Sequence, residues 1–114
     1  MKLIIAGSRG IFDYRIVRQA VEDSDFEFIT EVVSGAAKGV DTLGEEWADE
    51  YFIPVKHFPA DWDKHGRKAG ALRNIEMGDY ADALVAIRKD GSRGTTHMIE
   101  YMQKLGKPVF VVDI

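Results

Sequence analysis

Three short segments combine glycine and serine or alanine with a basic residue: GSRG (7–10), SGAAKGVD (34–41) and RKDGSRG (88–94). Loops of this composition let backbone N–H groups approach an anion such as phosphate, and the dipole of a following helix adds favourable potential. None has the glycine-lysine-serine/threonine ending of a P-loop or the G-x-G-x-x-G dinucleotide fingerprint. Each loop alone is also consistent with a simple chain turn. A ligand site therefore requires that the three loops converge in space.

Asp41 closes the second segment, in which Lys38 offers a positive charge. The carboxylate has two readings. It either caps the helix that follows, where the helix dipole favours it, or accepts hydrogen bonds from a ribose or a base.

The longest polar stretch, residues 59–77, also carries candidate ligand groups. Trp62 and His65 are suited to stacking on or hydrogen-bonding a base, whereas Arg67, Lys68 and Arg73 are suited to phosphate. Arg73 lies within a helical apolar pattern, so we expect it to point into a crevice, toward a phosphate or an acidic residue such as Asp41. The alternative is a surface lid whose tryptophan packs on the domain or on another subunit.

Catalytic and metal-binding patterns are weak. Ser8, Ser34, His97 and Asp41 supply the residue types of a triad, but no nucleophile-elbow motif is present. The chain has no cysteine, which excludes thiolate chemistry and a disulfide framework. The histidines, at positions 57, 65 and 97, show no metal-ligand spacing. We therefore expect no metal and no cofactor.

Apolar runs with strand character alternate with stretches of helical periodicity. The predicted strands are residues 2–6, 28–33, 54–58, 83–87 and 108–114, each read as buried on both faces of a parallel sheet. Four helices are predicted between them. The first begins after a cap at Asp13, the second has a capping box of Thr42 and Glu45, and the fourth ends before Gly106 and Pro108.

Strict β-α alternation predicts one α/β domain spanning residues 1–114, a three-layer, Rossmann-like, doubly wound parallel sheet of strand order 3-2-1-4-5 with four helices. Ligands of such sheets bind beyond the carboxyl ends of the strands, where the winding reverses. The three glycine-rich loops follow strands one, two and four and should meet there. An acidic cluster (Glu22, Asp23, Asp25, Glu27 and Glu31) precedes the second strand and should lie at the opposite edge.

The overall composition and net charge exclude or disfavour several classes of function. The chain is 46% hydrophobic and 30% charged, as in globular proteins, and its longest apolar run is far shorter than the roughly 20 residues of a membrane span. The formal net charge of −4 disfavours a broad nucleic-acid surface. We expect a cytoplasmic homo-oligomer that does not contact membranes.

The segments GSR, VVSGAAKGVDTLGEEWA, AGALRNIEM and DGSRGTTHMIEYMQKLGKPVFVV together resemble the SLOG superfamily. This superfamily unites the Rossmann-like core of the DNA-processing protein DprA (Smf) with the LOG phosphoribohydrolases, and the resemblance is closest to its small single-domain YspA-type members. It covers nearly the whole chain and has its motifs in the right order. In LOG enzymes a P-G-G-x-G-T-x-x-E motif supplies a glutamate for cleavage, whereas here the proline is missing and Met98 stands at that position.

The resemblance implies a site for a nucleotide or nucleotide derivative. With Lys38 added from the loop composition, the predicted ligand-binding residues are Gly7, Ser8, Arg9, Ser34, Gly35, Lys38, Gly39, Asp41, Arg73, Asn74, Gly91, Ser92, Gly94 and Thr95. The leading hypothesis is a binding module, acting as a sensor, a sponge or a subunit of a nucleotide-signalling pathway. The alternatives are a LOG-like hydrolase of the N-glycosidic bond, with Glu100 or Asp41 as the catalytic carboxylate, and DprA-like binding of single-stranded DNA.

Overall fold

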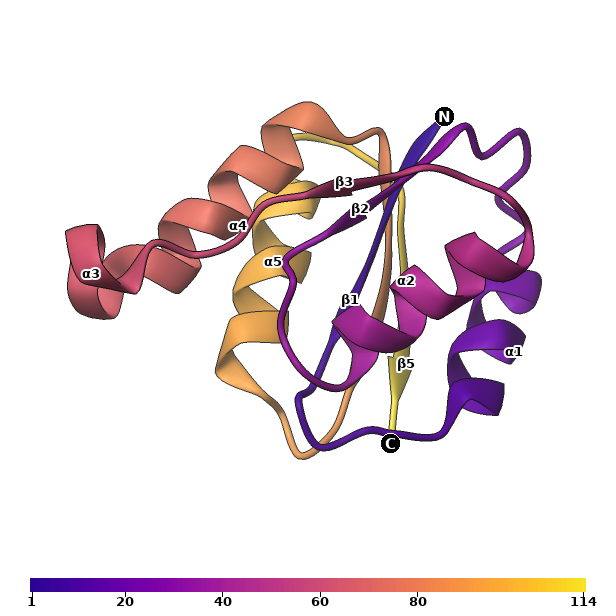
Figure 1. Ribbon diagram of the computed structural model, residues 1–114, viewed down its shortest axis with the longest axis horizontal. Helices are drawn as coiled ribbons and strands as arrows, with labels where there is room; N and C mark the ends of the chain where they lie inside the picture. Colours follow the sequence, from indigo (N-terminus) through magenta and orange to yellow (C-terminus); the bar gives the residue numbers. More distant parts are fainter.

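The computed structural model describes residues 1–114 as a five-stranded, fully parallel sheet with helices on both faces (Figure 1). The strand order, β3-β2-β1-β4-β5, is the predicted one. The register pairs Leu3 of β1 with Val32 of β2 and with Ala83 of β4. The strands are β1 (Lys2–Gly7), β2 (Glu31–Ser34), β3 (Val55–His57), β4 (Ala83–Arg88) and β5 (Val109–Asp113).

The four predicted helices form the two outer layers. α1 (Tyr14–Ser24) and α2 (Val40–Glu50) cover one face of the sheet, where Val17 and Leu43 pack with Leu3 and Val85. α4 (Ala69–Tyr80) and α5 (Arg93–Lys104) cover the other face, through a methionine-rich cluster that contains Met77, Met98 and Met102. The central strands are therefore buried on both sides, which explains their continuous apolar runs.

A short element was not anticipated from the sequence. Within the long polar stretch, α3 (Trp62–His65) makes one helical turn and is followed by a 3₁₀ turn, η1 (Gly66–Lys68). None of the residues of either turn is buried. Figure 1 shows this segment at the far left, projecting beyond the body of the domain.

Three local predictions need correction. β2 starts at Glu31 rather than residue 28, because Phe28 has a left-handed backbone (φ 57°) that breaks the strand. β3 and β5 are edge strands, so Lys56 and His57 are exposed instead of buried, and no residue of β5 is fully buried. The capping box at the start of α2 is wrong: Thr42 donates to the carbonyl of Ala37, and α2 begins after Gly39 without a side-chain cap.

Two other predicted helix ends are confirmed, the start of α1 and the end of α5. Asp13 is the N-cap of α1 and accepts a hydrogen bond from Arg15 N at 3.0 Å. Gly106, with φ 72°, turns the chain after α5. The longest helices, α4 and α5, have 12 residues each, and no helix combines the length and apolar character needed to cross a membrane.

Candidate functional site

The loops after β1, β2 and β4 converge at the carboxyl edge of the sheet, and Ser8 joins them. Its backbone N–H donates to Ile87 O at 3.0 Å, and its hydroxyl accepts from Lys89 N at 2.9 Å. Its carbonyl accepts from Val40 N at the start of α2. Because β1, β2 and β4 are adjacent and parallel, their carboxyl ends lie side by side. The predicted convergence is thus confirmed, and the acidic residues that precede β2 lie at the other edge.

Gly39 allows this convergence. Its φ of 76° belongs to the left-handed half of backbone space, and a Cβ at this position would lie 2.5 Å from Ser8 O and 2.6 Å from Arg9 O. A side chain there would push the first two loops apart. Gly39 therefore serves loop packing and does not line a cavity.

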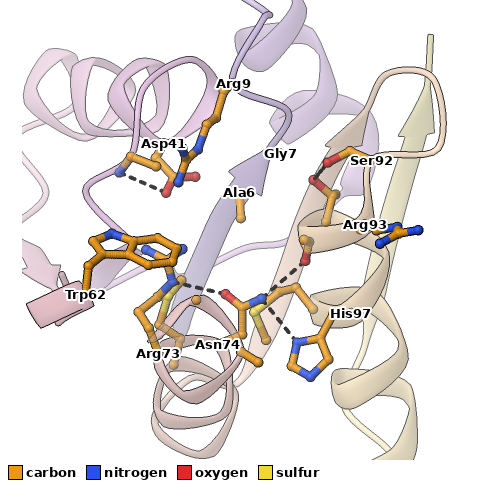
Figure 2. Close-up of a pocket in the computed structure, with 17 residues that line it drawn as sticks. Ala6, Gly7, Arg9, Asp41, Trp62, Arg73, Asn74, Ser92, Arg93 and His97 are labelled. Atoms are coloured by element: carbon orange, nitrogen blue, oxygen red, sulfur yellow. Dashed lines mark hydrogen bonds between the residues drawn. The ribbon is translucent and has the colours of Figure 1, made fainter. Parts of the chain in front are cut away.

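A cavity of about 550 Å³ opens between these loops, α4 and the start of α5 (Figure 2). Three arginines and a single carboxylate line it together with an apolar floor that includes Ala6, Met77 and Met98. Its volume is within the range typical of small-molecule sites. Eight of the predicted ligand-binding residues line the cavity: Gly7, Arg9, Asp41, Arg73, Asn74, Ser92, Gly94 and Thr95.

A smaller cavity of about 300 Å³ adjoins the first. The two share Arg9, Ala37, Trp62 and Arg73, so these residues form the ridge between them. Two further predicted residues, Gly35 and Lys38, line the smaller cavity.

Five predicted residues lie outside both cavities. Ser8 and Gly39 hold the loops together, as described above. Ser34 is buried and donates its hydroxyl to Glu45 while accepting from Ala36 N, so it shapes the second loop from behind. Gly91 has φ 65° with open space around it and turns the chain before α5. Glu100, the candidate catalytic carboxylate, is exposed on α5.

Arg73 points into the site and is held by neutral groups. Its Nη1 donates to the carbonyl of Gly35, and its Nε donates to Asn74 Oδ1 at 3.1 Å. The expected alternative partner, Asp41, interacts with it electrostatically but makes no ion pair within 4 Å. Arg73 Nη2 makes no hydrogen bond within the chain. The guanidinium is therefore fixed in orientation and keeps donor capacity for a ligand.

Asn74 connects Arg73 to the start of α5, as the dashed lines in Figure 2 show. Its side-chain nitrogen lies 3.2 Å from Gly94 O and 3.2 Å from His97 Nδ1. Oδ1 already accepts from Arg73, so the amide orientation is set, and His97 Nδ1 acts as an acceptor in this arrangement. Asn74 is 8% exposed and has every polar atom paired.

Asp41 is the buried carboxylate of the site and lies in the first turn of α2. Its Oδ2 accepts from Ala37 N at 3.2 Å. Burial raises the pKa of Asp41 to about 6, while the N–H groups of Ala37 and Gly7 and the charge of Arg73 act in the opposite direction. It therefore caps the loop before α2 and is not the N-cap of the helix, which is Gly39.

The two glycine-rich helix starts differ in what their amides do. In the 34–41 loop, the N–H groups of Ala36, Ala37 and Val40 already donate to Ser34, Asp41 and Ser8. The next two amides of α2, those of residues 41 and 42, donate to no acceptor in the protein. At the start of α5, the N-cap Ser92 makes no side-chain capping bond, and the N–H groups of residues 93–95 donate to no acceptor in the protein. Gly94 and Thr95 line the cavity. Three successive free amides thus lie at the start of α5, in residues that line the cavity, whereas part of the amides before α2 are already occupied.

Sequence reasoning missed part of the lining. His97, Gly70 and Ala71 line the cavity but are absent from the predicted ligand-binding residues. Their helical spacing around Asn74 and Met98 was the available signal, because residues three or four apart share a helix face. Arg93 is among the lining residues, but Figure 2 shows its guanidinium directed away from the cavity. No cluster of three or more histidine or acidic side chains that could hold a metal ion is present.

Comparison with known proteins assigns the family. Residues 1–65 match the model of the YspA, cpYpsA-related SLOG family, YAcAr. The chain belongs to this SLOG family. It is also 36% identical to the Gene 61 protein of Mycobacterium phage D29 over 118 residues, which cover 95% of this chain and 93% of the phage protein. No solved structure matches the chain. The resemblance to SLOG proteins inferred from the loop motifs is thereby confirmed.

Proposed function

We propose that the chain binds a nucleotide or nucleotide-derived small molecule in the 550 Å³ cavity, with its phosphate at the start of α5. The observation that carries this proposal is the pairing of two donor groups around one space. The unbonded N–H groups of residues 93–95 stand on one side, and the guanidinium of Arg73 stands on the other. Backbone amides at a helix start and a fixed arginine are the donors that phosphate prefers.

The rest of the lining fits the remainder of such a ligand. Ala6, Met77 and Met98 give an apolar floor against which a base or sugar ring can pack. Asp41 lines the same cavity as Arg9, and its carboxylate provides an acceptor for ribose hydroxyls. Membership of the SLOG family supports a nucleotide-related role at the level of the family.

Calorimetry against AMP, ADP-ribose, NAD and cyclic nucleotides tests the proposal. We expect saturable, one-to-one binding of at least one member at micromolar to sub-millimolar concentration. Circular dichroism on the same sample establishes that the protein is folded. A folded protein that binds no member of the panel more tightly than millimolar contradicts the proposal.

We favour binding without hydrolysis. Glu100 lies outside the cavity, and Met98 occupies the buried position that faces it, so Asp41 is the single carboxylate in the lining. Glycoside hydrolysis normally uses a pair of carboxyl groups on opposite sides of the bond. Chromatography after long incubation of AMP with concentrated protein should therefore show no free adenine. Release of adenine that Asp41→Asn abolishes would establish the hydrolase instead.

Single-stranded DNA binding is the third hypothesis, and the acidic net charge disfavours it. Mobility-shift assays with single-stranded oligonucleotides should show no complex in low salt. A complex whose affinity falls steeply with added salt would revive this hypothesis. A role as sensor, sponge or pathway subunit, and assembly into a homo-oligomer, remain predictions.

A further inference from the structure

Trp62 is exposed in a way that the fold does not require. Its side chain is 51% exposed, whereas the other tryptophan, Trp47, is 7% exposed and belongs to the core. Every residue from Asp61 to Lys68 is exposed, so this segment contributes no core packing. Its internal bonds are local: Asp61 accepts from Lys64 N, and Gly66 N donates to the carbonyl of Trp62. Fold stability alone does not account for a large apolar ring at its start.

The indole ring of Trp62 lies beside the candidate ligand site. Trp62 lines both cavities and lies on the ridge that it shares with Arg9 and Arg73. In Figure 2 the indole lies at the mouth of the site, on the same side as Arg73 and across from Ser92 at the start of α5. A ligand whose phosphate is bound by residues 93–95 would extend from that end of the cavity toward the indole. Its flat group would then lie beside the ring.

Small residues beneath the indole leave room for this group. Gly70 and Ala71 occupy the first turn of α4 and line the cavity. A Cβ at Gly70 would lie 3.5 Å from Trp62 Cη2, an ordinary contact, so the ring rests on the helix at its edge. Met77 and Met98 form the floor deeper in the cavity, each 1% exposed. The indole and the floor together bound a slot with apolar surfaces and a cationic rim.

We propose that Trp62 is the base-recognition residue of the site and selects ligands that carry a planar nucleobase by stacking on it. The inference rests on the proposed function, since it assigns a role within the same cavity. Base–aromatic stacking tolerates any base because every base has a π face. Trp62 therefore distinguishes a nucleotide from a sugar phosphate rather than one base from another.

AMP and ribose 5-phosphate form a matched pair of probes, because the second is the first without its base. Protein-detected NMR titrations that extend to millimolar ligand concentrations can measure the affinity of the protein for each of them. Wild type should prefer AMP, and Trp62→Ala should weaken AMP binding by about 5- to 150-fold, the range for loss of one stacked base. Binding of ribose 5-phosphate should change by less than about twofold. Trp62→Phe, which keeps a ring, should retain most of the AMP affinity.

Two controls complete the design. Phe12→Ala removes another exposed aromatic side chain, 71% exposed and outside both cavities, and should leave AMP binding unchanged. The chain has two tryptophans, so AMP should change the fluorescence of wild type but not of Trp62→Phe, in which the buried Trp47 alone emits.

The outcomes separate the two proposals. If wild type binds AMP and Trp62→Ala binds it equally well, the stacking role is overturned and nucleotide binding stands. If Trp62→Ala loses affinity for AMP and for ribose 5-phosphate equally, the stacking role is overturned as well. The residue then shapes the site without contacting the base. If wild type binds neither AMP, ribose 5-phosphate nor any other member of the nucleotide panel, both proposals fall.

Discussion

Asn74 Oδ1 accepts a hydrogen bond from Arg73 Nε at 3.1 Å, so a neutral amide rather than a carboxylate orients the guanidinium. A carboxylate partner would neutralise the arginine and compete with an anionic ligand. An amide fixes the side chain and leaves its positive charge available. Desolvation lowers the pKa of Arg73, and Asp41 opposes this effect, but arginine stays charged at any pH that proteins experience.

Replacement of Arg73 by lysine tests whether ligand binding requires the planar, forked guanidinium group in addition to its charge. Arg73→Lys keeps the charge but cannot bond Gly35 O, Asn74 Oδ1 and a phosphate at once. We expect nucleotide binding to weaken by about 1–3 kcal/mol in calorimetry, the scale of a charge-assisted hydrogen bond, with a smaller change in Tm. Arg18→Lys, an exposed exchange at the opposite end of the sheet, is the control. Normal binding with a much lower Tm would make Arg73 a structural residue.

Asn74 should matter for stability as well as for binding. Asn74→Ala leaves Arg73 Nε without its acceptor and removes the side-chain donor to Gly94 O, at a site that is 8% exposed. Removal of one partner of buried hydrogen bonds costs about 1–3 kcal/mol, which urea unfolding can measure. Gln103→Ala, on the exposed face of α5, should change the free energy of unfolding by less than about 0.5 kcal/mol. A loss in Asn74→Ala no larger than in this control would remove Asn74 from the network.

The sheet and the meeting of its loops were predictable because they depend on patterns along the chain. Continuous apolar runs such as 83–87 indicate strands buried on both faces, and β-α alternation leaves few topologies. The exposure of the edge strand β3 was not predicted by these patterns. Its apolar residues were assigned to the core, although an edge position exposes Lys56 and His57.

The contacts within the site were less predictable because they depend on helix phase and rotamers. α5 begins at Arg93, and successive residues turn by about 100°, so Thr95 and Met98 share the inner face while Glu100 lies on the outer one. A shift of the helix start by one residue would change that assignment. Composition likewise predicted anion binding by the 34–41 loop, but the amides of Ala36 and Ala37 already donate to Ser34 and Asp41, which composition does not reveal.

The raised pKa of Asp41 makes stability depend on pH. Burial lifts its pKa from 3.8 to about 6, so the native state binds more protons than the unfolded state between these values. The ionised carboxylate thus destabilises the fold above about pH 6, and this cost is relieved as pH falls toward 4. Between pH 7.5 and 4.5, wild type should therefore gain roughly 1–3 kcal/mol of stability relative to Asp41→Asn. Urea unfolding at pH 4.5 and 7.5 measures the difference, and identical slopes in both proteins would contradict it.

Protonation of the same carboxyl should favour an anionic ligand, because it removes the repulsion of phosphate while the carboxyl can still accept a hydrogen bond from a ribose hydroxyl. Affinity for AMP should rise as pH falls from 7.5 to 5.5 by more in wild type than in Asp41→Asn. The titration of the AMP phosphate is common to both proteins, so the difference between them isolates Asp41. Calorimetry in buffers of different ionisation enthalpy should also detect proton uptake on binding in wild type. Equal pH dependence in the two proteins would place the ligand away from this carboxyl.

Gly94 offers a steric test of the start of α5 that does not disturb the fold. It lines the cavity, and a Cβ built on it meets no atom within 4 Å. Gly94→Ala therefore adds one methyl group near the amides proposed to hold phosphate. Alanine is favoured over glycine in a helix by about 1 kcal/mol, so Tm should stay the same or rise. Phosphate needs close approach to the backbone, so we expect AMP affinity to fall by about tenfold or more. Gly10→Ala, likewise free of neighbours but outside the cavity, should alter neither quantity. Full AMP affinity in Gly94→Ala would move the phosphate away from α5.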